Sequence, residues 1–215
     1  MANTTAHPPL RHFVLEELRR QIVTGKFAPG ARLYEEEIAT DLGVSRNPVR
    51  EAVQALAAEG FVDIEPRRGA RVAVISPARA RELFEVREVL EGLVASLAAI
   101  HRTADELAEM RALVDDGFRA ADSGDLASLP PLNTRFHHLL ATTARNQLLA
   151  ETIERLRHLI EWIYAQRIAH RAPPSWSEHR SIVEAIADCD AAVAERAART
   201  HIAQARDAYV TSAAH

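Results

Sequence analysis

Apolar positions along the first sixty residues recur every three or four residues, which is the spacing of one helix face. In the first such segment Leu18 and Ile22 lie on the same face, and Gly25 follows as a stop. Gly43 and Gly60 end the next two segments in the same way. This periodicity predicts helices over residues 10–24, 35–42 and 45–59.

Two short runs rich in β-branched residues follow, over 61–65 and 70–75. Between them lies Pro66-Arg67-Arg68-Gly69, which predicts a tight turn with a basic tip. Three helices followed by such a hairpin are typical of a winged helix-turn-helix domain.

From Ser76-Pro77 onward every segment has helical periodicity. The Ser76 hydroxyl can cap a helix, and proline suits the first helical turn. We therefore place the domain boundary here, with a winged helix-turn-helix over residues 1–76 and an all-α antiparallel helical bundle over 77–215. The fold class is mainly α. The helices predicted for the second domain cover residues 77–101, 103–122, 125–143, 146–170, 175–188 and 190–212.

The 215 residues are 47% hydrophobic but only 5% aromatic, so aliphatic side chains must fill the cores. The apolar stretches are far shorter than the roughly 18 residues that a membrane span needs. The polar N-terminus lacks the apolar core of a signal peptide. The lone Cys189 cannot form an internal disulfide. These features favour a cytoplasmic protein with no membrane partner.

The formal net charge of −4 does not suit a protein that coats nucleic acid. Residues 1–76 hold ten basic and ten acidic side chains, and so have no net charge. DNA binding by this domain must therefore depend on a few well-placed arginines.

The segment 42–53 has the features of a DNA-reading helix and the turn before it. Gly43 permits the left-handed backbone of a tight turn between two helices. Ser45 is placed to cap the second helix, and Pro48 lies within its first turn.

Arg46 and Arg50 are four residues apart and lie on the outer face of this helix, near its N-terminus. Recognition helices present base-reading side chains at that end, and an arginine can donate two hydrogen bonds to guanine. Asn47 can contact adenine or a phosphate. Two arginines taken alone are better explained as solvated surface residues, but the surrounding turn and cap favour the DNA-reading interpretation.

The stretch Leu15 to Val74 resembles the DNA-binding domain of the GntR family of bacterial regulators. The family usually has threonine at the position of Asn47. The matching landmarks are Ile22-Val23-Thr24-Gly25, Pro29-Gly30, Glu37-Ile38-Ala39, the Leu42–Ala52 run, Glu59-Gly60-Phe61-Val62 and Arg68-Gly69.

This resemblance implies a homodimer that places two recognition helices in successive major grooves of a pseudo-palindromic, double-stranded DNA operator. The wing tip would reach the flanking minor groove or the backbone. The residues expected to contact DNA are Ser45, Arg46, Asn47, Arg50, Arg67, Arg68 and Gly69.

Four polar side chains of the second domain have a spacing that can bring them together. Asn133 and His137 are four residues apart and project from one helix face. His179 and His201 lie in two helices joined by a short turn, each about eleven residues from it, and are therefore nearly level. His138 points about 100° away from His137 and is not expected to be a ligand.

Three imidazoles and an amide oxygen suit a late first-row divalent ion, with zinc or nickel favoured. Scattered histidines are also common in protein cores, and the spacing alone leaves that alternative open.

Residues 80–205 resemble the all-helical ligand-binding domain of the FadR subfamily, the FCD type. The matching segments are Phe84–Glu91, Asn133–His137, Asn146–Leu149, Glu178-His179 and His201-Ile202.

Many members of that subfamily bind a divalent metal through one aspartate and three histidines, beneath an organic acid. Asn133 replaces the aspartate here, which keeps a coordinating oxygen but removes a negative charge. Arg87 lies where the subfamily directs an arginine toward the acid. The alternative for Arg87 is a salt bridge with Glu91, four residues on. The implied metal ligands are Asn133, His137, His179 and His201.

Together these features predict a DNA-binding transcriptional regulator, most often a repressor, and not an enzyme. A small carboxylate or sugar acid bound near the metal would modulate its operator binding. Two alternatives remain open, a regulator with a purely structural metal and no effector, and a metal-dependent hydrolase.

Overall fold

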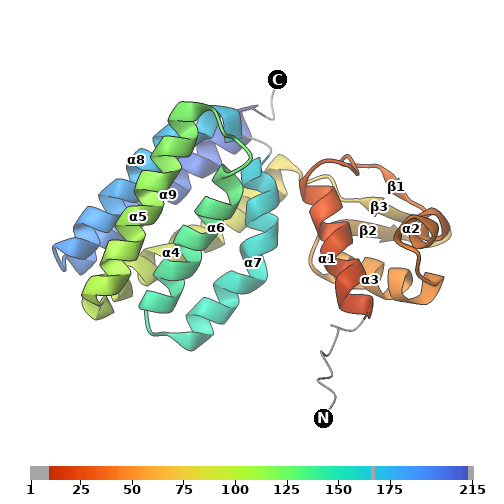
Figure 1. The fold of residues 1–215 in the computed structure, drawn as a ribbon, viewed down its shortest axis with the longest axis horizontal. Helices are drawn as coiled ribbons and strands as arrows, with labels where there is room; N and C mark the ends of the chain where they lie inside the picture. Colours follow the sequence, from red (N-terminus) through yellow and green to blue (C-terminus); the bar gives the residue numbers. More distant parts are fainter. Residues whose placement is uncertain (1–9, 166–167, 213–215) are drawn as a thin grey trace, which may run out of the picture. The chain divides into compact units, whose positions relative to one another are not determined.

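The computed structural model describes residues 10–165 and 168–212. The chain divides into two compact units, Met1–Val74 and Ile75–His215 (Figure 1). The division falls two residues before the end of the first predicted domain, at residue 76. The protein is mainly helical in its described residues, as the periodicity predicted.

The first unit consists of three helices and a three-stranded antiparallel sheet in the order β1-β3-β2. The two-residue strand β1 was not predicted, because two residues carry no periodicity. Leu18, Val49 and Phe61 are buried in the core that these elements share. The elements are α1 (Leu10–Val23), β1 (Arg32–Leu33), α2 (Glu35–Leu42), α3 (Arg46–Ala58), β2 (Val62–Glu65) and β3 (Gly69–Val72).

The predicted hairpin is confirmed, with Val62 opposite Val72 and Glu65 opposite Gly69. Its tip turns through two left-handed residues, Arg67 at φ 65° and Gly69 at φ 86°. Glycine adopts this conformation without the steric cost that an L side chain meets. The short connection therefore projects the tip beyond the sheet.

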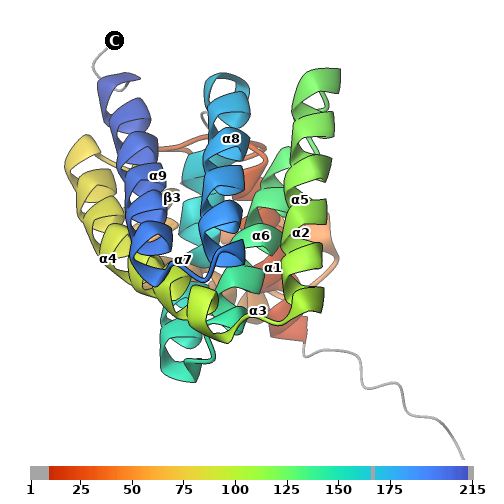
Figure 2. The ribbon, with the colours of Figure 1, turned by 90° about the vertical axis from the view of Figure 1, so that its left-hand side faces the viewer.

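The second unit is an all-helical bundle. Figure 2 shows α4, α9, α8 and α5 side by side, with α6 and α7 behind them. Buried aliphatic side chains, including Val94, Leu113 and Ile186, fill the space between the helices. The helices are α4 (Pro77–His101), α5 (Ala104–Ser123), α6 (Leu129–Thr143), α7 (Gln147–Ala165), α8 (Ile168–Ala187) and α9 (Ala191–Ser212).

The helix starts follow the capping chemistry of the sequence. The Ser76 hydroxyl accepts a hydrogen bond from the backbone N–H of Arg79, as predicted for the first residue of the bundle. The side chain of Asn146 accepts from the N–H of Leu149 in the same way. Thr103 and Glu106 form a reciprocal capping box at the start of α5.

Two predicted helix starts are wrong. Helix α6 begins at Leu129 and not at 125, and helix α8 begins at Ile168 and not at 175. The start of α8 was predicted at Ser175, yet the helix begins earlier and includes Pro173 and Pro174. The buried side chain of Trp176 follows them directly and anchors that turn in the core. The predicted helix over 146–170 ends at Ala165, next to residues that lie outside the described part.

The close packing of Trp176 against α5 yields a test of this fold. A Cβ atom added at Gly117 would lie 2.2 Å from Cδ2 of Trp176. We expect Gly117→Ala to lower the free energy of unfolding by about 1–3 kcal/mol, because overpacking outweighs the higher helix propensity of alanine. Urea titration followed by circular dichroism measures this. Asp122→Ala, at an exposed position of the same helix, is the control. An unchanged unfolding midpoint for Gly117→Ala would contradict the packing described.

Candidate functional site

The N-terminal end of α3 presents polar side chains to solvent. Arg46, Asn47 and Arg50 are exposed, whereas Val49 and Val53 are buried beneath them. Gly43 has the left-handed backbone predicted for the turn, at φ 64° and ψ 33°. The sequence thus fixes which face of α3 is turned outward.

Ser45 has the extended backbone of an N-cap residue, but its hydroxyl makes no capping hydrogen bond. The prediction of a side-chain cap is therefore wrong. Ser45 is exposed at this helix N-terminus, and the N-terminus of a helix attracts anions such as phosphate.

Asn47 connects two charged neighbours on α3. Its carbonyl oxygen accepts a 2.8 Å hydrogen bond from the Arg50 guanidinium, and its amide donates to Glu51 over 2.8 Å. The Arg50 side chain is thus held at one edge along the outer face of the helix. This linkage depends on an amide, which both accepts and donates.

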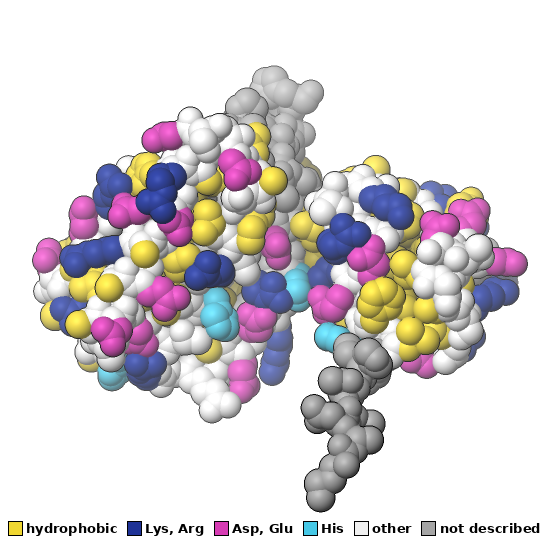
Figure 3. Space-filling model, in the orientation of Figure 1, with side chains coloured by type: hydrophobic (Ala, Val, Ile, Leu, Met, Phe, Trp, Pro, Cys, Tyr) yellow, Lys and Arg dark blue, Asp and Glu magenta, His cyan; other side chains and the backbone are white. Residues whose placement is uncertain are grey.

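The tip of the hairpin carries the other predicted DNA contacts. Arg67, Arg68 and Gly69 are exposed. Arg32, at the start of β1, donates a 2.7 Å hydrogen bond to the carbonyl oxygen of Arg68 and so supports the tip. On the face shown in Figure 3, basic and acidic side chains are interspersed. That view agrees with the zero net charge of this unit.

Three histidines meet inside the helical unit, from α6, α8 and α9. The ligand atoms offered by His137, His179 and His201 all lie within 4.8 Å of one another. The Nε2 atoms of His179 and His201 are 3.3 Å apart, close to the separation of about 3.4 Å expected for two nitrogens on a tetrahedral zinc ion. His138 points elsewhere, as predicted, with a side chain 62% exposed and 3.8 Å from Glu154.

Two carboxylates orient this histidine cluster. Nδ1 of His137 lies 2.7 Å from Glu91, and Nδ1 of His201 lies 2.7 Å from Glu178. A carboxylate can only accept, so Nδ1 of each ring is the donor and Nε2 is the atom left to bind something else. Carboxylates orient metal-binding histidines in this way in many proteins.

The electrostatics of the cluster follow from burial and from these pairs. Burial lowers the pKa of His201 to about 4, despite its hydrogen bond to Glu178. Burial alone would raise the pKa of Glu91, but the adjacent charge of Arg87 and the hydrogen bond from His137 hold it well below its usual range. At neutral pH the cluster therefore combines a neutral imidazole at His201 with an ionised carboxylate at Glu91.

The donor set fits a divalent metal ion. Nε2 of His137 is buried and makes no hydrogen bond within the protein, which is costly for a polar atom unless something else binds it. Neutral imidazoles and nearby carboxylates are ligands and partners that zinc and nickel accept. Asn133 is buried and lines the adjoining cavity together with His137.

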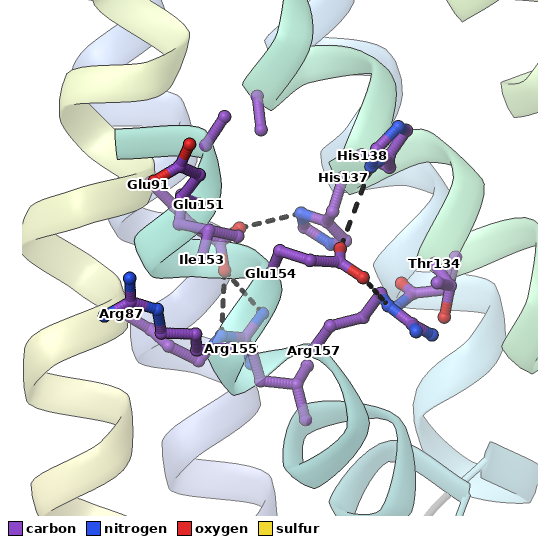
Figure 4. Close-up of a pocket in the computed structure, with 14 residues that line it drawn as sticks. Arg87, Glu91, Thr134, His137, His138, Glu151, Ile153, Glu154, Arg155 and Arg157 are labelled. Atoms are coloured by element: carbon purple, nitrogen blue, oxygen red, sulfur yellow. Dashed lines mark hydrogen bonds and ion pairs between the residues drawn. The ribbon is translucent and has the colours of Figure 1, made fainter. Parts of the chain in front are cut away.

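A cavity of about 390 Å³ opens beside the histidines, between α4, α6 and α7 (Figure 4). Ile153, Ile160 and two alanines give it an apolar wall. Its charged lining includes the buried pair Arg87 and Glu91 and the exposed Arg155; Arg157, Glu151 and Glu154 complete it. A second, much smaller cavity of about 30 Å³ shares Arg87, Asn133 and His137 with it.

Arg87 forms the salt bridge that the sequence left open as an alternative. Its Nε donates a 2.8 Å hydrogen bond to Glu91, and its Nη2 lies 2.8 Å from the same oxygen. One edge of the guanidinium is therefore used by Glu91. Arg87 also lines the cavity, so the salt bridge with Glu91 does not remove it from the pocket.

Sequence reasoning missed several residues of the site. It treated Glu91 only as a salt-bridge partner of Arg87, and it gave no role to Glu178 or Arg155. The i+4 spacing from Arg87 to Glu91 was a usable signal. Glu178 directly precedes His179, so the spacing that places residues 179 and 201 level across the turn was also a usable signal for its pairing with His201.

Comparison with protein families identifies both units. Residues 10–72 match the model described as bacterial regulatory proteins, gntR family, and residues 82–204 match the FCD domain. In the described part of the chain, the helices are too short or too polar to cross a membrane.

Curated relatives match over most of their length. The chain is 33% identical over 196 residues to the HTH-type transcriptional repressor RspR of Escherichia coli K12, covering 90% of this chain and 86% of that protein. It is 31% identical over 218 residues to the probable D-xylose utilization operon transcriptional repressor of Paenarthrobacter nicotinovorans, covering 100% of this chain and 92% of that protein.

Solved structures share the fold. The Escherichia coli protein McbR/YncC superposes with a TM-score of 0.81 at 22% identity, covering 97% of this chain and 100% of that one. A GntR-type regulator from Rhodococcus sp. RHA1, described as putative, superposes with a TM-score of 0.79 at 25% identity, covering 94% of this chain and 98% of that one.

Proposed function

The chain belongs to the GntR family of bacterial regulatory proteins and carries an FCD domain, and from this premise we propose that it is a metal-containing transcriptional repressor whose operator binding responds to a small organic acid. That it is a DNA-binding transcriptional regulator follows from its family. The single observation that supports the finer proposal is the buried histidine cluster beside a cavity that holds an arginine. The repressor assignment follows the two relatives named as repressors.

DNA recognition is assigned to the exposed end of α3 and to the hairpin tip. Arg46 and Arg50 are exposed and lie one helical turn apart, as base-reading side chains of a recognition helix do. Asn47 holds Arg50 in place, which lowers the entropy lost when its guanidinium meets a base edge. Arg67 and Arg68 supply contacts to the backbone or to the minor groove.

The assignment of Arg50 is tested with an operator selected in vitro from a pool of random duplexes. Arg50→Ala is expected to reduce affinity to the level of non-specific binding, because one bidentate base contact contributes about 1–3 kcal/mol and the dimer loses two. Gel-shift titrations at fixed salt measure this with the operator and a scrambled duplex. Arg20→Ala, an exposed arginine of α1, is the control and should bind normally. Unchanged operator affinity of Arg50→Ala would refute the role.

The metal is assigned to the cluster of His137, His179 and His201, with the Asn133 oxygen completing the set. A bound zinc or nickel ion would neutralise the ionised carboxylates around it and give the cavity a positive end. The amide of Asn133 supplies less negative charge than a carboxylate would. The site is therefore expected to hold the ion less tightly and to attract anions more strongly.

Metal binding is tested by measuring zinc and nickel content after dialysis against a limiting concentration of each ion. His179→Ala is expected to lose the metal. Glu178→Gln is expected to weaken affinity about 10–100-fold, as removal of a histidine-orienting carboxylate usually does. His138→Ala removes the neighbouring surface imidazole and should retain full occupancy. Full metal content in His179→Ala would remove that residue from the ligand set.

The effector is assigned to the cavity of about 390 Å³, whose volume suits a small molecule. An anion has two cationic partners there, the bound metal and the edge of Arg87 that Glu91 does not use. The apolar wall of Ile153 and Ile160 favours an acid with an aliphatic portion over a fully hydroxylated sugar acid. Effector binding would then shift the balance between dimer arrangements with different operator affinity.

The effector assignment is tested by thermal shift on metal-loaded protein, with a panel of short aliphatic carboxylates and with gluconate as the sugar acid. An aliphatic acid is expected to raise the melting temperature, since a ligand at 100 times its Kd stabilises the folded state by about 2.7 kcal/mol. Arg87→Gln is expected to lose the shift, and Arg135→Gln, at an exposed site on α6, to keep it. A shift that persists in Arg87→Gln would contradict the assignment.

A purely structural metal is the second candidate, and it is favoured by the burial of His179 and His201 between α8 and α9. The same thermal measurements separate the two. A structural ion predicts a large fall in melting temperature on chelation and no response to any acid. A sensing site predicts a modest fall and loss of the acid response.

A further inference from the structure

Glu51 is the only acidic residue of α3, and it is half-buried beside the outer face of that helix. Its carboxylate accepts a 2.8 Å hydrogen bond from the amide nitrogen of Asn47. The carbonyl oxygen of Asn47 in turn accepts a 2.8 Å hydrogen bond from Nη2 of Arg50. Glu51, Asn47 and Arg50 therefore form a continuous chain of hydrogen bonds, which we call the α3 triad.

The charged ends of the α3 triad fix the orientation of the amide between them. A carboxylate only accepts hydrogen bonds, and a guanidinium only donates them. The nitrogen of the Asn47 amide must therefore face Glu51, and its oxygen must face Arg50. In the described part of the chain no carboxylate forms an ion pair with Arg50. Glu51 thus acts on Arg50 through a neutral amide and leaves its guanidinium free of any direct ion pair.

We propose that Glu51 is a positioning residue for base recognition, which holds Arg50 through Asn47, and that the α3 triad reads one guanine as a unit while Asn47 reads no base of its own. Guanine presents two acceptors in the major groove, O6 and N7. The guanidinium of Arg50 has five N–H groups, and Asn47 uses one of them. The remaining donors are enough for both guanine atoms.

The engaged amide of Asn47 disfavours a contact with adenine. An asparagine that reads adenine uses its amide oxygen and nitrogen together. Both atoms are here hydrogen-bonded to charged groups, and such bonds are stronger than those between neutral groups. An adenine would have to displace both partners and would return only neutral hydrogen bonds. The threonine that is usual in the family at this position has one hydroxyl and lacks the separate donor and acceptor of an amide.

Glu51 also acts on the phosphates of DNA, in the opposite direction. The two arginines of α3 give the helix a formal charge of +2, and Glu51 lowers it to +1. A carboxylate near the DNA backbone weakens binding to every sequence. The four acidic residues of α2 add to this repulsion but do not alter the sign of the effect of Glu51. Glu51 is therefore expected to lower non-specific affinity while it improves the discrimination between bases.

This inference rests on the proposed function, because it requires that Arg50 contacts a base. It adds a residue, Glu51, that acts on recognition without touching the base. It also makes Asn47 and Glu51 responsible for the same position of the operator as Arg50.

The first test measures base preference with the full-length chain and the operator selected in vitro. Affinities are measured for the operator and for duplexes that each carry one substituted base pair. Arg50→Lys keeps the charge but loses the two-pronged donor, so the base pair at which it loses preference is the one that Arg50 reads. Asn47→Ala and Glu51→Ala are expected to lose about 2–10-fold in discrimination at that same base pair, because Arg50 must then be ordered during binding. Preference at every other position should stay unchanged.

The second test measures affinity for a scrambled duplex at low salt. Glu51→Ala and Glu51→Gln are each expected to bind it about two- to threefold more tightly, as expected for removing a unit charge about 7 Å from a phosphate. Glu51→Gln retains an oxygen that can accept from Asn47, so it should keep most of the guanine discrimination that Glu51→Ala loses. Glu184→Gln removes an exposed carboxylate of α8 and should change neither property. A purely structural role of Glu51 would instead weaken binding to both duplexes.

The outcomes separate this inference from the proposed function. Relaxed preference at a second base pair in Asn47→Ala would show that Asn47 reads a base itself. Full guanine discrimination in either alanine variant, or weaker binding of Glu51→Ala to the scrambled duplex, would overturn the positioning role of Glu51. Circular dichroism shows whether each variant is folded. If Arg50→Lys alters no base preference, the proposed reading role of Arg50 falls, and the inference falls with it.

Discussion

Burying an ionised carboxylate costs several kcal/mol unless its oxygens are compensated, and Glu91 is such a group at the centre of the helical unit. Arg87 and His137 compensate it from two sides. The same two contacts orient the Arg87 guanidinium and the His137 ring beside the cavity. The shape and charge of the pocket therefore depend on one carboxylate that the protein cannot leave unpaired.

The first unit must bind DNA without a net positive charge. It has no net charge, so a broad positive field cannot hold it on DNA. Its arginines are instead placed by short-range contacts, with Arg50 held by Asn47 and the hairpin tip supported by Arg32. Recognition in such a unit depends more on the positions of single side chains than on long-range attraction.

The sequence predicted what local rules control. Helix periodicity, the Ser76 cap and the Arg67–Gly69 tip lie within short windows, and the structure has them. Strand β1 was not predicted because two residues show no pattern. The start of α8 was predicted at Ser175, although the helix already includes Pro173 and Pro174. The spacing arguments grouped the histidines, but the carboxylates that orient them come from other helices, and only the tertiary fold brings Glu91 to His137.

Helix α4 carries Glu91 on its buried side and Leu93 on its exposed side, within a single turn. An α-helix is stiff over such a short length, so a movement of the backbone at Glu91 displaces Leu93 by nearly the same amount. A movement of this turn therefore changes the lining of the pocket and the outer surface of α4 together. The pocket and the solvent-facing side of α4 are thus separated by the diameter of one helix, and a mutation in this turn alters both at once.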